Sequence, residues 1–191
     1  ESSIRYNLYV DCMPSDELGQ LDAEQVSFTA AVPTVWLMLL QHLEEQNLKL
    51  PYLDTVVIGG SAAPRMMIEK FEKDYEVDVN HAWGMTELSP LGTMGVLKRK
   101  MHDLSFDERV DIKVKQGRPP YLVQMKITDD DGNELPRDGK TFGNLKVKGP
   151  FIIETYMKDD GGEILDAEGY FDTGDVATLD ADGFMQITDR S

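Results

Sequence analysis

Largely apolar runs alternate with helical patterns along the first part of the chain. Residues 26–32 and 53–58 are such runs, and their β-branched side chains are typical of buried strands. Over 34–47 and 64–75 the apolar residues recur every three or four positions, which predicts helices. A third strand is predicted from Val77. Strands that alternate with helices favour a parallel sheet, because each helix carries the chain back across the sheet.

Polar residues at the expected helix ends suit capping. The Thr34 hydroxyl is expected to cap the helix that follows Pro33. Ser105 and Glu108 have the spacing of a capping box, so a helix is predicted over 105–116.

A further strand is predicted near the start of the chain. Residues 4–10 alternate between apolar and polar side chains, a pattern typical of a strand.

The pattern changes from helical to alternating at residues 117–120, Gly-Arg-Pro-Pro. Beyond this point strands are predicted over residues 123–127, 142–148, 170–179 and 184–187. The sequence therefore predicts an α/β fold followed by a mainly β part. The α/β subdomain is expected over 1–116, with a parallel sheet, and a small β-barrel-like subdomain over 117–191.

Two acidic segments separate the predicted β-strands. Residues 129–134 and 180–183 are rich in aspartate and each contains a glycine. Neither has the full spacing of an EF-hand calcium loop. Tight hairpin turns, in which aspartate and glycine are common, are the expected structure.

Composition narrows the class of protein. The chain of 191 residues carries a formal net charge of −16, which argues against a general nucleic-acid or anionic-membrane surface. No apolar run approaches the roughly 18 residues of a membrane span, and the first ten residues do not resemble a signal peptide. Cys12 is the only cysteine, which excludes an internal disulfide, so a cytoplasmic location is expected.

Two segments with the chemistry of a nucleotide site follow predicted strands. Gly-Gly-Ser-Ala-Ala-Pro at 59–64 comes between a predicted strand and a predicted helix. The unpaired backbone N–H groups at the start of such a helix can bind a phosphate. Trp-Gly-Met-Thr-Glu follows the third strand at 83–87. Parallel strands send both segments to one edge of the sheet, where open α/β sheets bind ligands.

The second segment combines four side-chain types that suit a nucleotide with its metal. Trp83 can stack on a base, and Gly84 leaves room for a close backbone approach. The Thr86 hydroxyl can bond a phosphate, and Glu87 can hold a magnesium ion. An ordinary strand followed by a loop would have the same local pattern, so these residues alone leave both interpretations open.

These segments belong to a series of motifs in a fixed order. After 59–64 and 83–87 come Tyr-Phe-Asp-Thr-Gly-Asp at 170–175 and Ile-Thr-Asp-Arg at 187–190. The series resembles the adenylate-forming superfamily of acyl-CoA synthetases, adenylation domains and luciferases. Ala-Val-Pro-Thr-Val-Trp at 31–36 is most similar to medium- and long-chain fatty acyl-CoA synthetases, and methylmercaptopropionate-CoA ligases are similar too. The resemblance begins near residue 22.

The resemblance implies a two-step ligase reaction. A carboxylate attacks the α-phosphate of Mg-ATP and gives an acyl-adenylate and pyrophosphate. The thiol of coenzyme A then takes the acyl group, and AMP leaves. The implied small molecules are therefore a fatty acid, ATP or AMP, Mg²⁺ and coenzyme A.

The same resemblance implies a role for each motif residue. Thr86 would bond the α-phosphate, and Glu87 would hold magnesium. Trp83, which replaces the usual tyrosine, would stack on adenine beside Gly84. The remaining implied contacts are Asp175 with the ribose hydroxyls, Arg190 with the ribose and phosphate side, Gly60, Ser61 and Ala62 at the junction of the adenine and acyl pockets, and Trp36 either beside the acyl pocket or simply in the core.

Two features of the family are missing from the 191 residues. One is the Lys-bearing, Ser/Thr/Gly-rich phosphate loop, and the other is the C-terminal domain with its assisting lysine. We therefore expect an internal fragment of a ligase that forms no acyl-CoA by itself.

The sequence leaves several alternatives open. An adenylation domain for another carboxylate would share the same motifs. A non-catalytic interaction fragment would use apolar surface that the family covers with other subdomains. The acyl chain length and the oligomeric state, a homodimer included, are also open.

Overall fold

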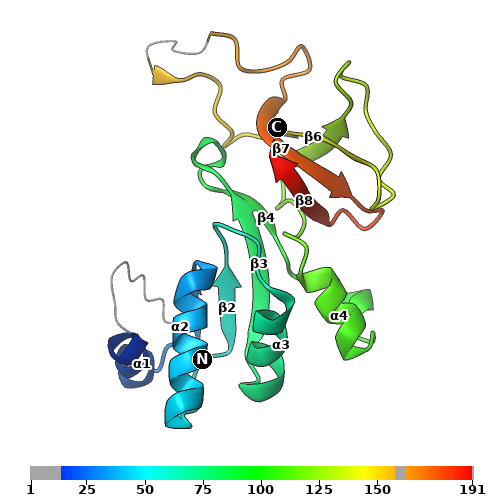
Figure 1. Cartoon of the computed structure of the whole chain (residues 1–191). Coiled ribbons are helices and arrows are strands. Elements are labelled where there is room, and N and C mark those ends of the chain that lie inside the picture. The colour runs from blue at the N-terminus through cyan, green and yellow to red at the C-terminus, as the bar shows by residue number, and fades with distance from the viewer. Residues whose placement is uncertain (1–13, 158–161, 191) are drawn as a thin grey trace. The chain divides into compact units, whose positions relative to one another are not determined.

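The structure is a computed structural model that describes residues 14–157 and 162–190 (Figure 1). The chain forms two compact units. Unit 1 contains Glu1–His81 and Leu97–Val114, and unit 2 contains Ala82–Val96 and Lys115–Ser191. The strand expected over 4–10 lies outside the described residues, and the domain boundary between residues 116 and 117 stays a prediction.

Unit 1 has the predicted α/β organisation. Its elements are α1 (Pro14–Ala23), β1 (Phe28–Ala31), α2 (Pro33–Gln46), β2 (Thr55–Ile58), α3 (Arg65–Asp74), the first part of β3 (Asp78–Gly84), η2 (Arg99–Met101) and α4 (Phe106–Lys113). β1 pairs with β2, and β2 with β3, both in parallel. The parallel sheet expected from the alternation of strands and helices is confirmed.

The apolar stripes of the helices form the core of unit 1. The residues of α2 and α3 buried there are Trp36, Leu39, Leu40, Leu43, Met67, Ile68 and Phe71. The rings of Trp36 and Phe71 meet edge to face, with their centroids 5.5 Å apart. Both stripes therefore turn inward, as the spacing of their apolar residues predicted.

The predicted capping of the helices is right in one place and wrong in another. Ser105 and Glu108 form the expected capping box at the start of α4. Thr34 does not cap α2, because the capping position is Val32 and no side chain bonds the helix end. Pro33 has a fixed φ and needs no backbone donor in the first turn, so the helix begins two residues earlier than a cap at Thr34 would place it. α4 ends at Lys113, earlier than expected.

Unit 2 contains an antiparallel sheet and a short hairpin. The hairpin pairs the end of β3 with β4 (Leu91–Met94) across η1 (Thr86–Leu88), and β4 was not predicted. The sheet has the order β5 (Gln124–Thr128), β6 (Phe142–Lys148), β7 (Phe171–Leu179), β8 (Met185–Arg190). All its pairs are antiparallel, and β5 and β8 are its edges among the described residues. The mainly β part is confirmed, but this open sheet is not a closed barrel.

The two acidic segments are turns, as predicted. The Asp129 carboxylate accepts from the backbone N–H groups of Asp131 and Asn133, which closes the turn after β5. Asp180 accepts in the same way from Asp182 and Phe184 between β7 and β8. The aspartates serve as local acceptors that replace missing backbone partners.

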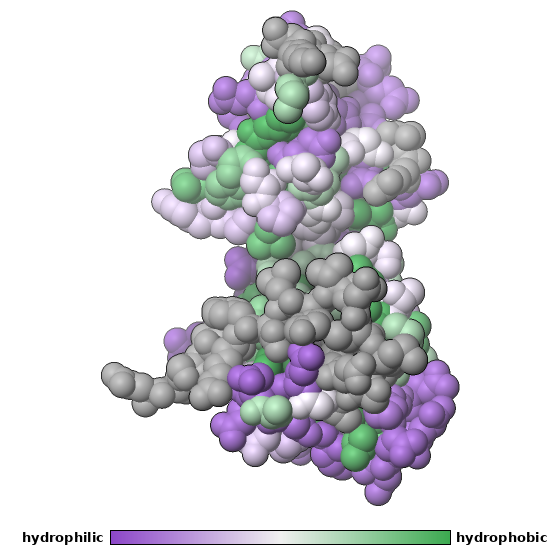
Figure 2. Space-filling view, turned by 90° about the vertical axis from the view of Figure 1, so that its left-hand side faces the viewer, coloured by the Kyte–Doolittle hydropathy of each residue, from purple (hydrophilic) through white to green (hydrophobic). Residues whose placement is uncertain are grey.

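The surface is consistent with the high charge of the chain. Hydrophilic residues cover much of the described surface on the face shown in Figure 2, with smaller apolar areas between them. Among the described residues, no helix is both long and apolar enough to cross a membrane.

Candidate functional site

The glycine-rich segment forms an exposed turn in unit 1. It leaves β2, whose last residue pairs with His81 of β3. Gly60 has a positive φ of 83°, a conformation that glycine adopts without strain. Gly60, Ser61 and Ala62 are exposed, whereas Ala63 is buried. The turn therefore presents backbone and small side chains to solvent at the carboxyl end of a parallel strand.

His81 anchors this turn, a role that the motifs did not reveal. Its ring is fully buried, and Nε2 accepts the backbone N–H of Ala63 over 3.2 Å. Nδ1 lies 3.1 Å from the carbonyl oxygen of Val114, so this nitrogen carries the proton and donates. A neutral imidazole thus ties the turn to β3 and to the end of α4. The only sequence feature that pointed to this role of His81 was its position directly before Ala-Trp-Gly at 82–84.

Trp83 and Asp175 meet in unit 2, although they are 92 positions apart in sequence. The indole Nε1 donates to Oδ2 of Asp175 over 2.9 Å. Their exposed fractions are 8% and 5%. A buried carboxylate needs such donors, because leaving a buried polar group without a hydrogen bond costs about 1–3 kcal/mol, and more when the group is charged. Trp83 therefore holds Asp175 in place, and only a small part of its ring remains exposed.

Residues 84–90 form a closed loop that presents Thr86 and Glu87. The backbone N–H of Met85 donates to the carbonyl oxygen of Pro90 over 2.9 Å. A Cβ at Gly84 would overlap this carbonyl group, so the loop itself requires glycine there. Leu88 is fully buried in the core of unit 2 and anchors η1. Thr86 is exposed and Glu87 half-buried.

The other predicted residues lie in two different environments. Arg190 lies in β8, opposite Asp175 in the register of the sheet. Trp36 is fully buried in the core of unit 1, and its Nε1 donates to the carbonyl oxygens of Ala31 and Val57. The structure thus brings Trp83 and Asp175 into contact within unit 2. The turn at 59–64 belongs to unit 1.

The oxygen donors near η1 fit a metal that is shared with a nucleotide. Within the described parts of the chain, no group of three or more His, Cys, Asp or Glu side chains lies close enough together to hold a metal ion by itself. Glu87 is half-buried, and its sequence neighbour Thr86 is exposed. Mg²⁺ takes one or two protein carboxylates and completes its shell with phosphate oxygens and water. A single accessible carboxylate fits that mode of binding.

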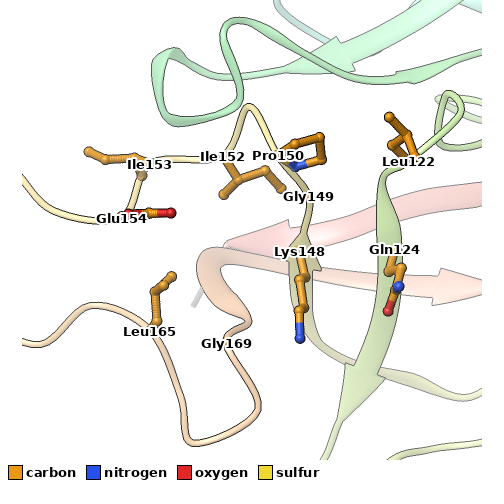
Figure 3. Close-up of a pocket in the computed structure, with 10 residues that line it drawn as sticks. All are labelled: Leu122, Gln124, Lys148, Gly149, Pro150, Ile152, Ile153, Glu154, Leu165 and Gly169. Carbon is orange, nitrogen blue, oxygen red and sulfur yellow. The ribbon is translucent and has the colours of Figure 1, made fainter.

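A pocket of about 420 Å³ also lies in unit 2 (Figure 3). Its lining residues are Leu122, Gln124, Lys148, Gly149, Pro150, Ile152, Ile153, Glu154, Leu165 and Gly169. Gln124 and Lys148 lie side by side on β5 and β6, and the Lys148 amine donates to the carbonyl oxygen of Glu168 over 2.6 Å. The neighbouring Lys126 amine donates a hydrogen bond to the Glu168 carboxylate, and this bond raises the pKa of Lys126.

Replacing Gly92 by alanine is expected to destabilise unit 2 through Trp83. A Cβ at Gly92 of β4 would overlap the six-membered part of the Trp83 ring. Moving that ring strains its hydrogen bond to Asp175, and overpacking a core typically costs about 1–3 kcal/mol. We expect the free energy of unfolding in urea to fall by about 2 kcal/mol.

Gly19→Ala provides the matched control for this substitution. Gly19 is an exposed residue of α1, and a Cβ there meets no atom within 4 Å. Alanine should stabilise that helix by roughly 0.5–1 kcal/mol. If Gly92→Ala were as well tolerated as Gly19→Ala, the packing of Gly92 against Trp83 would not limit stability.

Comparison with known proteins identifies relatives along almost the whole chain. The 3-methylmercaptopropionyl-CoA ligase of Ruegeria lacuscaerulensis is 47% identical over 171 residues, which cover 90% of this chain and 32% of that enzyme. The medium-chain-fatty-acid–CoA ligase of Ectopseudomonas oleovorans is 48% identical over 169 residues, covering 88% and 31%. The chain therefore spans about a third of the length of these relatives.

Solved structures of two ligases are similar in fold. The long-chain-fatty-acid-CoA ligase of Archaeoglobus fulgidus superposes with a TM-score of 0.78 at 26% identity, covering 93% of this chain and 36% of that one. The o-succinylbenzoate coenzyme A synthetase of Bacillus subtilis, in complex with ATP and magnesium, gives 0.72 at 25% identity and covers 93% and 34%. Residues 8–157 match the model of the AMP-binding enzyme family. The chain therefore belongs to the AMP-binding enzyme family.

Proposed function

We propose that the chain forms part of the adenylate site of an AMP-forming fatty acyl-CoA ligase. The observation that carries this proposal is its similarity to two CoA ligases of carboxylic acids, at 47% and 48% identity over about nine-tenths of the chain. The exposed turn at 59–64 and the loop that presents Thr86 and Glu87 support it, because both offer donors or acceptors suited to Mg-ATP.

The proposed reaction has two balanced steps. A carboxylate oxygen of the fatty acid bonds to the α-phosphorus of ATP, and the bond to pyrophosphate breaks. The coenzyme A sulfur then attacks the acyl carbon, its thiol proton is lost, and AMP leaves with the electron pair of the broken acyl–oxygen bond. Charge develops on the phosphate oxygens in the first step. Positioned donors and cations that stabilise this charge are therefore the main requirement.

Each residue of the site has a proposed task. Thr86 donates a hydrogen bond from its hydroxyl to the α-phosphate, and Glu87 holds magnesium, which neutralises phosphate charge when it is bound. Asp175 accepts the ribose hydroxyls, and Arg190 binds the ribose and phosphate side. The adenine is bordered by Trp83 and Gly84, and the junction with the acyl pocket by Gly60, Ser61 and Ala62. Trp36 supports that wall from the core.

An assay of the full-length protein tests this function. ATP, magnesium, coenzyme A and a panel of fatty acids of different chain length are supplied, and pyrophosphate and acyl-CoA are measured together. Equal amounts of both products, formed only when a fatty acid is present, are expected. Pyrophosphate release with other carboxylates only would favour the adenylation of another acid, and no release with any acid would contradict the proposal.

Asp175→Asn is expected to weaken AMP binding about tenfold to a hundredfold. An asparagine oxygen can still accept the Trp83 N–H, so the local fold should persist. The amide replaces a charged acceptor, and hydrogen bonds to charged groups contribute about 1.5–3 kcal/mol each. Calorimetry with AMP measures the change.

Asp131→Asn is the control, since Asp131 is an exposed turn residue that undergoes the same loss of charge. Equal AMP affinity in the wild type and both variants would remove Asp175 from the proposed ribose site. The ligase assay would still decide separately whether the protein forms acyl-CoA.

A further inference from the structure

The loop that follows β6 holds Glu87 at two points. The backbone N–H of Ile153 donates to the carbonyl oxygen of Glu87 over 2.9 Å. The Tyr156 hydroxyl donates to Oε1 of the Glu87 carboxylate, also over 2.9 Å. One bond fixes the backbone of η1, and the other fixes the direction of the carboxylate. Both donors lie more than sixty positions from Glu87 in sequence, and all three residues belong to unit 2.

Both sides of this contact are anchored in the core of unit 2. Ile152 is buried in that core, and its backbone N–H closes a turn with the carbonyl oxygen of Gly149. Leu88, next to Glu87, is fully buried in the same core. Figure 3 shows Ile152 and Ile153 on the loop that also lines the pocket. The loop therefore supports Glu87 from a fixed base.

The Tyr156 hydroxyl is well suited to be a persistent hydrogen-bond donor to Glu87. A phenol that donates to a carboxylate forms a charge-assisted bond, stronger than one between neutral groups. This bond, together with the backbone bond from Ile153, keeps the Glu87 carboxylate oriented.

The position of Tyr156 argues against a role in packing alone. Its exposed fraction is 36%, and the adjacent Met157 is 84% exposed. A side chain placed so near the surface contributes little to the core, whereas its hydroxyl reaches the one carboxylate of the loop at 84–90. Carboxylates that hold a metal are commonly hydrogen-bonded in turn, and loss of such a partner typically costs about ten- to a hundredfold in metal affinity.

We propose that Tyr156 is a positioning residue that orients the Glu87 carboxylate toward the magnesium ion of Mg-ATP. This inference rests on the proposed ligase function. Ile153 completes the arrangement by holding the backbone of the same residue. The loop after β6 is thus part of the nucleotide site, although it belongs to none of the motifs found in the sequence.

Tyr156→Phe tests this inference, because it removes the hydroxyl and keeps the ring. In the full-length protein, the magnesium concentration that gives half-maximal pyrophosphate release is expected to rise roughly tenfold. The KM for the fatty acid should stay unchanged. Manganese binding in the presence of a non-hydrolysable ATP analogue, followed by electron paramagnetic resonance, should weaken by a similar factor and does not depend on turnover.

Tyr121→Phe is the matched control. Tyr121 is 88% exposed in the same unit, and its loss of a hydroxyl should change neither the magnesium dependence nor manganese binding. A second measurement uses Glu87→Ala. If Tyr156 acts through Glu87, adding Tyr156→Phe to that variant should weaken manganese binding no further.

The outcomes separate the two proposals. If the wild type needs magnesium for pyrophosphate release but Tyr156→Phe has the same half-saturation and manganese affinity, the positioning role is overturned and the ligase function stands. An additional loss of manganese affinity on the Glu87→Ala background would also overturn it. A wild type that releases no pyrophosphate with any fatty acid overturns the proposed function, and the inference falls with it.

Discussion

Glu87→Gln is expected to lower the rate of Mg-ATP-dependent pyrophosphate release about a hundredfold, because removing one electrostatic contribution at a reacting centre typically costs a factor of 10²–10³. Glutamine has the same length and can still accept the Tyr156 hydroxyl through its carbonyl oxygen. The backbone bond from Ile153 is also retained. The variant therefore isolates the charge of the carboxylate from the fold of the loop.

The measurement is pyrophosphate release by the full-length protein at several magnesium concentrations, with thermal unfolding recorded in parallel. Glu163→Gln is the control, since Glu163 is exposed in the same unit and loses the same charge. The melting temperature of Glu87→Gln should match the wild type. A variant that retained nearly full activity at low magnesium would show that Glu87 does not hold the metal.

The local architecture could be largely predicted from the sequence. The period of the apolar residues indicated α2 and α3, because each buries one continuous stripe. The parallel order of β1, β2 and β3 followed from helices that connect successive strands. In such cases the information lies within a few neighbouring positions, where periodicity and chain connection are enough.

Contacts between distant parts of the chain could not be predicted in the same way. β4 reads Leu-Gly-Thr-Met, and its glycine is there to accommodate the Trp83 ring, so the strand lacks a clear alternation. The partnership of Trp83 with Asp175, and that of Tyr156 with Glu87, depend on the packing of whole strands and loops. Most of these residues lie in the motifs, but the motifs do not indicate which residues contact one another.

A buried lysine illustrates the same point in unit 1. Lys113 ends α4, where a helical pattern suggests an ordinary exposed charge that favours the helix terminus. Instead, its side chain is only 4% exposed and its amine contacts both Glu72 of α3 and Asp78 of β3. The partners lie 41 and 35 positions away, so no local pattern could identify them. This ion cluster joins α4 to the sheet.

Lys113→Ala is expected to reduce the free energy of unfolding by about 3 kcal/mol, because removing one partner of a buried pair leaves an uncompensated charge. The Asp78 side chain is 55% exposed and can be hydrated in the variant. The Glu72 side chain is 11% exposed, so it would carry most of the penalty. Urea denaturation, followed by the change in tryptophan fluorescence, measures the loss.

Two further variants decide whether the effect is the stranded charge of Glu72. Lys49→Ala removes an exposed lysine of unit 1 and should change the free energy of unfolding by less than about 0.5 kcal/mol. Glu72→Gln, added to Lys113→Ala, should restore at least about 1 kcal/mol, because the neutral amide can still accept the Val79 N–H while no buried charge remains. If the double variant were as unstable as Lys113→Ala, the lysine would stabilise α4 by packing its long side chain, and not by neutralising the carboxylates.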